Sequence, residues 1–158
     1  MNRYMTGIVG IIILAGCEST PTEQYPLLPL IQAELLSKNW EDLERIPPLY
    51  LIEDAIRGNE GCASIEYVIT PDYDIRDIKV IASSGKYFAK AASLNVKQWK
   101  WSELPKGIAL EPIKTSTQFQ FCLETGDGHC SELRTFEESQ CSGADVIYSI
   151  GYRIKRSG

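Results

Sequence analysis

The fold is decided by residues 61–101, which read GCASIEYVITPDYDIRDIKVIASSGKYFAKAASLNVKQWKW. Apolar and polar residues alternate through 62–69 and again through 75–82, and the turn-forming residues 70–74 separate the two runs. A period of two is typical of strands, so this part of the chain predicts a β-hairpin. After Gly85, apolar residues recur at helical spacing as far as Trp99, which predicts a helix of about three turns.

Further elements are expected on both sides of this stretch. Residues 51–57 suggest a short helix that ends at Gly58, and the apolar spacing in residues 27–46 predicts one or two more. Residues 113–123 return to β character, and residues 146–154 alternate with a clean period of two. From residue 51 to residue 123 the expected order is helix, strand, strand, helix, strand, which is an α+β fold with a fourth strand added at the C-terminus.

Size and composition exclude several classes of function. The 158 residues are enough for about one domain, and 44% hydrophobic with 23% charged residues is ordinary for a globular protein. The net charge of −5, with no basic stripe, makes nucleic acid an unexpected partner. His129 is the single histidine, and the sequence assembles no nucleophile, base and orienting group. We therefore expect neither enzyme activity nor a cofactor.

The first 17 residues resemble a bacterial lipoprotein signal peptide. Arg3 precedes an apolar run from Ile8 to Leu14, and the segment ends Leu14-Ala15-Gly16-Cys17. This run is shorter than the roughly 20 residues that a membrane-spanning helix needs. The resemblance implies that residues 1–16 are removed and that Cys17 carries the lipid of a membrane anchor. Because Glu18 follows, rather than the aspartate that commonly marks inner-membrane retention, we expect the periplasmic face of the outer membrane.

A set of motif residues recurs in order between residues 48 and 123. They are Pro48, Tyr50, Ala55, Arg57, Gly61, Ile65, Tyr67, Asp72, Asp77, Ile78, Val80, Ser83, Ser84, Gly85, Phe88, Ala91, Ala92, Val96, Trp99 and Trp101. Their order resembles the C-terminal domain of the TonB family, the periplasmic module of bacterial energy transducers. The resemblance implies an α+β fold with an antiparallel sheet, to which this chain adds a C-terminal disulfide loop and strand.

The resemblance also implies a site. In the family, a peptide from an outer-membrane receptor adds to a sheet edge as an extra strand. The corresponding partner-binding edge would be the strand 113–123, with Ile113, Thr115, Thr117, Phe119 and Phe121 on one face. The strand expected at 146–154 is an alternative occupant of this edge. Energy transducers carry a membrane-spanning helix and a long spacer, whereas here a lipid anchor and a tether of about nine residues are expected. We therefore do not expect this chain to couple to an inner-membrane motor.

Four cysteines remain once Cys17 is acylated: Cys62, Cys122, Cys130 and Cys141. An even number in an oxidising compartment favours two disulfides, for which three connectivities exist. The strand order that the resemblance implies favours Cys62–Cys122 and Cys130–Cys141. A zinc site built from His129 and the cysteines is a weaker alternative because no Cys-x-x-Cys pair is present. The acidic turns 72–74 and 125–128 lack the ligand count of a calcium loop, so no metal is expected.

These expectations divide the chain into four parts. Residues 1–16 are the signal peptide, 17–46 the lipidated cysteine with a tether and helical segment, 47–123 the TonB-like domain, and 124–158 a cysteine-containing extension with a fourth strand. The expected function is that of a membrane-anchored periplasmic lipoprotein that binds an envelope partner, either a TonB-dependent receptor or a transport or secretion component, by strand addition. The alternative is a structural envelope scaffold that binds peptidoglycan or self-associates, and a homodimer is compatible with both.

Overall fold

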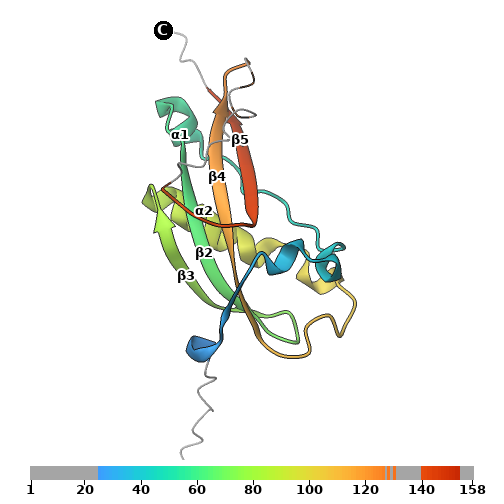
Figure 1. Ribbon diagram of the computed structural model, residues 1–158. Helices are drawn as coiled ribbons and strands as arrows, with labels where there is room; N and C mark the ends of the chain where they lie inside the picture. The colour runs from blue at the N-terminus through green and yellow to red at the C-terminus, as the bar shows by residue number, and fades with distance from the viewer. Residues whose placement is uncertain (1–24, 127, 129, 131–139, 154–158) are drawn as a thin grey trace, which may run out of the picture.

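The computed structural model describes residues 25–126, 128, 130 and 140–153. Residues 1–24, with the expected signal peptide and Cys17, and the histidine at position 129 lie outside the described residues. The central part of the chain forms α1 (Ile52–Arg57), β2 (Gly61–Ile69), β3 (Ile75–Ser83), α2 (Lys86–Gln98) and β4 (Ile113–Glu124), as Figure 1 shows. This order confirms the predicted helix, strand, strand, helix, strand.

The strands form one mixed sheet. β2 pairs in antiparallel fashion with β3 on one side and with β4 on the other. Two further strands, β1 (Leu30–Gln32) and β5 (Val146–Tyr152), pair in parallel with β4. The family-like part of the sheet is therefore antiparallel as predicted, and the strands that precede and follow that part extend it with parallel pairing.

The segment before α1 differs from the prediction of short α-helices. It contains β1 and three 3-10 turns, η1 (Tyr25–Leu27), η2 (Glu34–Leu36) and η3 (Lys38–Trp40). Pro29 has no backbone N–H for a helix, and Ala33 has a left-handed φ of 57°, so the chain cannot continue as one helix. The apolar spacing instead reflects the burial of Leu35, Trp40 and Leu43 in the core.

The hydrophobic core lies between the sheet and α2. Helix α2 crosses one face of the sheet in Figure 1 and buries Phe88, Ala92 and Val96 against the inner side chains of β2 and β4. Gly61 permits this close approach, because a Cβ atom there would lie only 2.4 Å from the Phe88 ring. Trp40, Trp99 and Trp101 close the core beyond the end of α2.

The opposite face of the sheet is crossed by residues 140–145, which lead into β5 (Figure 1). The Ser64 hydroxyl on β2 donates a hydrogen bond to the Ser142 carbonyl at 2.8 Å, and a Cβ atom on Gly143 would meet the Gln118 side chain. This crossing returns the chain to the same end of the sheet at which β4 begins its pairing with β5, as a parallel neighbour requires. Among the described residues, no helix is long and apolar enough to cross a membrane.

Two disulfides are present, but the predicted pairing was wrong. The bonds are Cys62–Cys141 and Cys122–Cys130, with Cα atoms 6.0 and 5.7 Å apart. In the β2–β4 register, Cys62 stands opposite Gln120, so Cys122 is only a diagonal neighbour on the same face. The crossing of residues 140–145 brings Cys141 over Cys62, and the loop after β4 returns Cys130 to Cys122.

Candidate functional site

The predicted partner-binding edge on β4 is occupied in this structure. β2 pairs with one side of β4 over residues 113–121. On the other side, β1 pairs with residues 114–116 and β5 pairs with residues 118–124. β4 is therefore an interior strand, which corrects the expectation of an open edge and favours the alternative that the C-terminal strand covers it.

The five residues named for that edge have their side chains on the α2 side of the sheet. Thr115, Thr117, Phe119 and Phe121 are buried, and Ile113 packs against the same core while partly exposed. Thr115 also donates its hydroxyl to the Ile31 carbonyl of β1 at 2.8 Å. These side chains support the domain from inside, so they are not placed to contact a partner.

A buried polar network fixes the start of β5. Arg45 Nη1 lies 2.7 Å from both carboxylate oxygens of Asp145, and the Thr117 hydroxyl donates to Asp145 Oδ2, also at 2.7 Å. Because the Thr117 proton is used in this way, the Tyr67 hydroxyl donates to Thr117 Oγ1 at 2.9 Å. Burial raises the pKa of Tyr67, so its hydroxyl stays protonated and continues to donate.

The network joins parts of the chain that are far apart in sequence. Arg45 comes before the family-like domain, Asp145 directly precedes β5, and Asp145 is 1% exposed. The Arg45 guanidinium also lies 5.7 Å from the centre of the Trp99 ring. Sequence reasoning did not single out either residue, and a separation of 100 positions leaves no local pattern that could have done so.

β5 follows β4 in an unbroken register from Gln118–Val146 to Glu124–Tyr152. The Gln118 N–H donates to the Asp145 carbonyl at 2.8 Å. Backbone groups of successive strand residues point to opposite edges, so those of residues 147, 149 and 151 face β4. The N–H and C=O groups of Val146, Ile150 and Tyr152 consequently point to the outer edge of β5.

The inner face of β5 packs against the chain that precedes α1. The Ser149 hydroxyl donates to the Pro48 carbonyl at 2.7 Å. A Cβ atom on Gly151 would lie 2.5 Å from the Tyr50 ring, so glycine permits this contact. On the outer face, Ile150 and Tyr152 are 42% and 73% exposed. β5 thus has a fixed inner face and an accessible apolar outer face.

Among the described residues, three strands have an outer edge with which no further strand pairs: β3, β5 and the three-residue strand β1. The pairing of β3 with β2 shifts at two places, and Asp77 within β3 has a left-handed φ of 47°. Such bulges, together with the charged residues 76, 77 and 79, discourage edge pairing. β5 has neither a register shift nor a charged residue. β1 is only three residues long, so β5 is the edge suited to strand addition.

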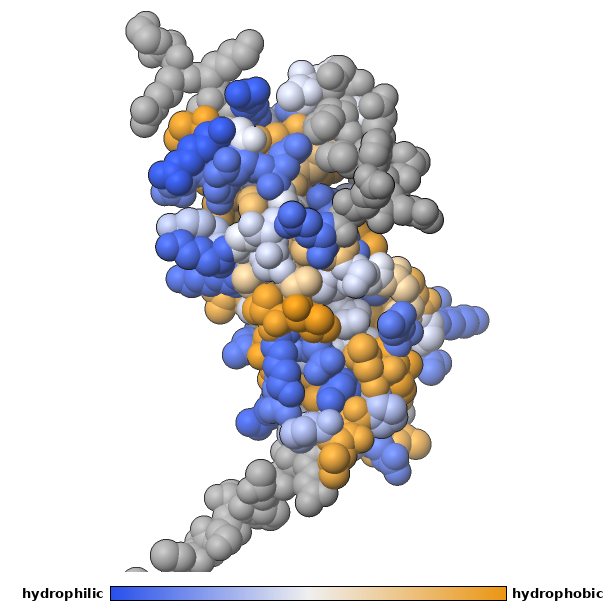
Figure 2. All heavy atoms as spheres, turned by 60° about the vertical axis from the view of Figure 1, so that its left-hand side comes forward, coloured by the Kyte–Doolittle hydropathy of each residue, from blue (hydrophilic) through white to orange (hydrophobic). Residues whose placement is uncertain are grey.

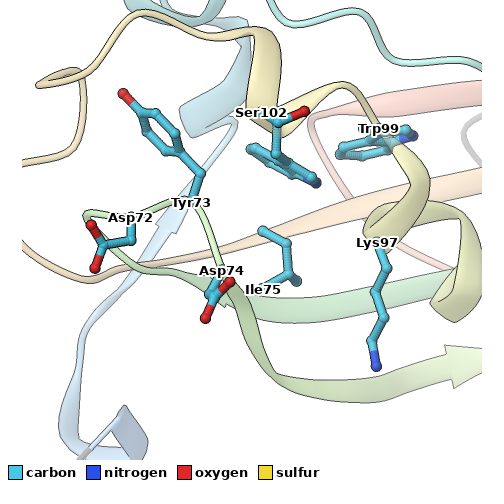
Figure 3. A pocket seen from close by; sticks show the side chains of 8 residues that line it. Asp72, Tyr73, Asp74, Ile75, Lys97, Trp99 and Ser102 are labelled. Atoms are coloured by element: carbon cyan, nitrogen blue, oxygen red, sulfur yellow. The ribbon is translucent and has the colours of Figure 1, made fainter.

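A separate pocket of about 400 Å³ lies between the β2–β3 turn and the end of α2. In Figure 3 the charged groups of Asp72, Asp74 and Lys97 lie on one side and the rings of Tyr73 and Trp99 on the other. Asp74 already pairs with Arg76 at 2.7 Å, and the Tyr73 hydroxyl donates to the Pro105 carbonyl at 2.5 Å. The polar groups of this turn therefore serve the fold, and we assign the pocket no ligand.

One group of residues has the ligand types of a metal site. Glu60, Cys122 and Cys130 place a carboxylate oxygen and two sulfur atoms within 4.8 Å of one another. Both cysteines are consumed by the disulfide, and Glu60 accepts the Leu123 N–H at 2.7 Å. A disulfide offers no thiolate, so this group is a structural cluster rather than a metal centre.

Two comparisons with known proteins found similarity to the central part of this chain. Residues 47–123 match the family model described as the Gram-negative bacterial TonB protein C-terminal. The solution NMR structure of the Pseudomonas aeruginosa TonB C-terminal domain is 24% identical, covering 49% of this chain and 80% of that one, with a TM-score of 0.41. No curated protein matches the sequence significantly. Residues 47–123, just under half of the chain, thus form a TonB C-terminal-like domain.

Proposed function

We propose that this chain is a lipid-anchored envelope protein whose TonB-like domain binds another envelope protein by strand addition at the outer edge of β5. The family match over residues 47–123 supports a protein-interaction role in the cell envelope. The observation that carries the proposal is the contrast in the sheet: β4 is paired on both sides, whereas β5 offers an uncharged and regular outer edge. The partner surface is thus one strand further out than the family-based expectation.

The geometry of β5 defines what such a partner contributes. An extended segment would exchange hydrogen bonds with the outward backbone groups of residues 146, 150 and 152, which supply affinity without regard to sequence. Ile150 and Tyr152 would select for apolar side chains on the same face. A receptor or a transport component with an uncharged extended segment meets these requirements.

A proline substitution tests the edge with little effect on the fold. The Ile150 N–H points outward, so Ile150→Pro removes a partner hydrogen bond and leaves the pairing with β4 intact. The matched control is Ser149→Pro, whose N–H faces β4 and whose loss should destabilise the domain. A photoreactive residue at Tyr152 in the full chain is expected to crosslink an envelope protein, and Ile150→Pro should abolish that product. If the crosslinked product persists in a folded Ile150→Pro chain, strand addition at the outer edge of β5 is refuted.

A second copy of the chain is the alternative occupant. Antiparallel pairing centred on Ser149 would place Val146 opposite Tyr152 and Tyr148 opposite Ile150 of the other copy, so apolar side chains meet along the outer face. A crosslinked product of twice the chain mass, lost in the same proline variant, would favour self-association over a different partner. The control is a photoreactive residue at Ile81 on β3, which should not give the product of twice the chain mass.

The anchor is tested separately. Acylation at Cys17 and retention at the outer membrane, inferred from Glu18, predict that the mature protein fractionates with outer membranes. Cys17→Ser should release it to the soluble periplasmic fraction. Unchanged fractionation of the Cys17→Ser chain would contradict lipid anchoring, while recovery of the native chain with inner membranes would contradict only the choice of membrane.

A further inference from the structure

We propose that the end of the domain at which β1 and β4 begin is a membrane-contacting surface, which presents exposed leucines to the lipid bilayer. This inference rests on the proposed anchoring at Cys17, and it concerns a surface distinct from the β5 edge. Four apolar side chains define the membrane-contacting surface: Leu27 is 78% exposed, Leu30 39%, Ile31 44% and Leu110 81%.

Strand pairing brings these residues to one end of the molecule. β1 and β4 are parallel, with Leu30 opposite Lys114. Leu27 and Leu110 both precede these paired residues by three or four positions, so both lie beyond the same end of the sheet. The Lys114 ammonium also donates to the Pro26 carbonyl at 3.2 Å, which holds η1 against the start of β4. Figure 2 shows apolar side chains at this lower end of the molecule.

The length of chain before Tyr25 limits how far this end can lie from the anchor. Eight residue steps separate Cys17 from Tyr25, and a fully extended chain covers about 27 Å in that number of steps. β4 alone has 12 residues, which corresponds to about 40 Å. The described chain begins at η1, at the lower end in Figure 1, so the membrane-contacting surface is the part of the domain nearest an acylated Cys17.

The composition of the segment suits a lipid surface. Residues 25–33 read YPLLPLIQA and carry no charged side chain. The neighbouring loop contributes Lys106 and Glu111, which are of opposite sign. The β2–β3 turn lies at the same end of the sheet, because Ile69 pairs with Ile113, and it adds the acidic Asp72 and Asp74. Because this end has no excess of positive charge, attraction to anionic headgroups does not drive binding. The driving force is the insertion of leucine side chains at the membrane interface. Binding should therefore change little when salt is raised.

Depth-dependent quenching in the lipidated full chain tests this surface. A fluorescent amino acid at position 27 or 110 should be quenched by nitroxide-labelled lipids in vesicles of phosphatidylethanolamine with a minority of phosphatidylglycerol. The matched control is position 49, a leucine that is 91% exposed and follows Pro48, which packs against β5. Equal quenching at all three positions, or none at 27 and 110, would overturn the proposed surface.

A second measurement separates this proposal from the anchor. In the Cys17→Ser chain without residues 1–16, we expect weak flotation with the same vesicles, and Leu27→Asp with Leu110→Asp should reduce the bound fraction by about tenfold. Leu49→Asp should leave it unchanged. If the native chain fractionates with membranes but position 27 is not quenched, the anchor stands and the membrane-contacting surface is refuted. If the native chain does not fractionate with membranes, both proposals fail.

Discussion

The two long outer strands of the sheet, β3 and β5, end the same sheet in opposite ways. β3 carries charged residues and two register shifts, and a turn of five residues joins it to its partner β2. β5 is regular and uncharged, and it pairs with β4, which ends more than twenty residues earlier in the chain. The first edge is protected against pairing and locally formed, whereas the second is open to pairing.

The difference also extends to what holds each strand. β5 is held from distant positions, by the Arg45–Asp145 pair, the Cys62–Cys141 bond and the Pro48–Ser149 hydrogen bond. β3 depends on its hairpin and on the cover of α2. Addition of β5 to the family-like domain therefore moves the accessible sheet edge outward. That edge then depends on contacts made by Cys141, Asp145 and Ser149, which lie outside residues 47–123. Changes at these contacts should affect β5 and spare β3.

Removal of the Cys62–Cys141 disulfide should have the largest effect. The bond spans 79 residues, so its loss in Cys62→Ala/Cys141→Ala should lower the free energy of unfolding by about 4.5 kcal/mol in the chain-entropy description. The matched control, Cys122→Ala/Cys130→Ala, opens a bond that spans 8 residues and should cost about 2.5 kcal/mol. Urea denaturation measures both. Equal losses would show that the long bond does not hold the approach to β5.

The buried ion pair comes next. Asp145→Ala leaves Arg45 and the Thr117 hydroxyl without their acceptor and should cost about 3 kcal/mol, at the lower end for buried pairs because the Arg45 side chain is 21% exposed. The control lies at the start of β3, where the Asp74–Arg76 pair is more than half exposed. Asp74→Ala should cost less than about 1 kcal/mol. A similar loss in both variants would remove the contrast between the two strands.

The sequence predicted the elements that depend on neighbours in the chain. The period-two alternation in residues 62–69 and 75–82 predicted the hairpin, and the spacing of Phe88, Ala92 and Val96 predicted α2, because core burial imposes these periods locally. The cysteines were recognised as disulfide-forming, and the alternation after Val146 predicted a strand. The TonB-like resemblance over residues 48–123 is confirmed by the family match.

The features that failed depend on tertiary placement. The spacing of Leu35, Trp40 and Leu43 imitates a helix, although irregular turns bury these side chains equally well. Cysteine pairing was wrong because it depends on where residues 140–145 cross the sheet. The occupied edge of β4 follows from the three-residue strand β1, too short for a periodic signal, and from the parallel placement of β5. Arg45 and Asp145 carry no local pattern that distinguishes them from surface charges.

A smaller effect is expected where β5 meets the chain before α1. Gly151→Ala would place a Cβ atom 2.5 Å from Tyr50 Cγ, which cannot rotate away as the end of a flexible side chain could. We expect a loss of about 1 to 3 kcal/mol from the resulting shift of packed groups. The control is Val80→Thr on β3, an exposed change that should stay within about 0.5 kcal/mol. Denaturation midpoints compare the two, and a neutral Gly151→Ala would mean that β5 can shift without cost.

The smallest effect concerns pH at the end of β4, where Glu124 pairs in register with Tyr152. The N–H of Gly126, with those of Gly128, Thr125 and Cys130, holds the pKa of Glu124 below its usual value. A lowered folded-state pKa stabilises the protein above the ordinary glutamate value, and this stabilisation is lost as pH falls through the folded-state value. The protection of the Gly126 and Gly151 amides from hydrogen exchange, taken relative to their intrinsic rates, should therefore fall below about pH 4, with little change in β3. Glu124→Gln should give low protection at these sites already at neutral pH and abolish the pH dependence of their protection factors, because a neutral amide accepts the same N–H groups more weakly. An unchanged pH profile in Glu124→Gln would assign the acid sensitivity of the β5 end to another group.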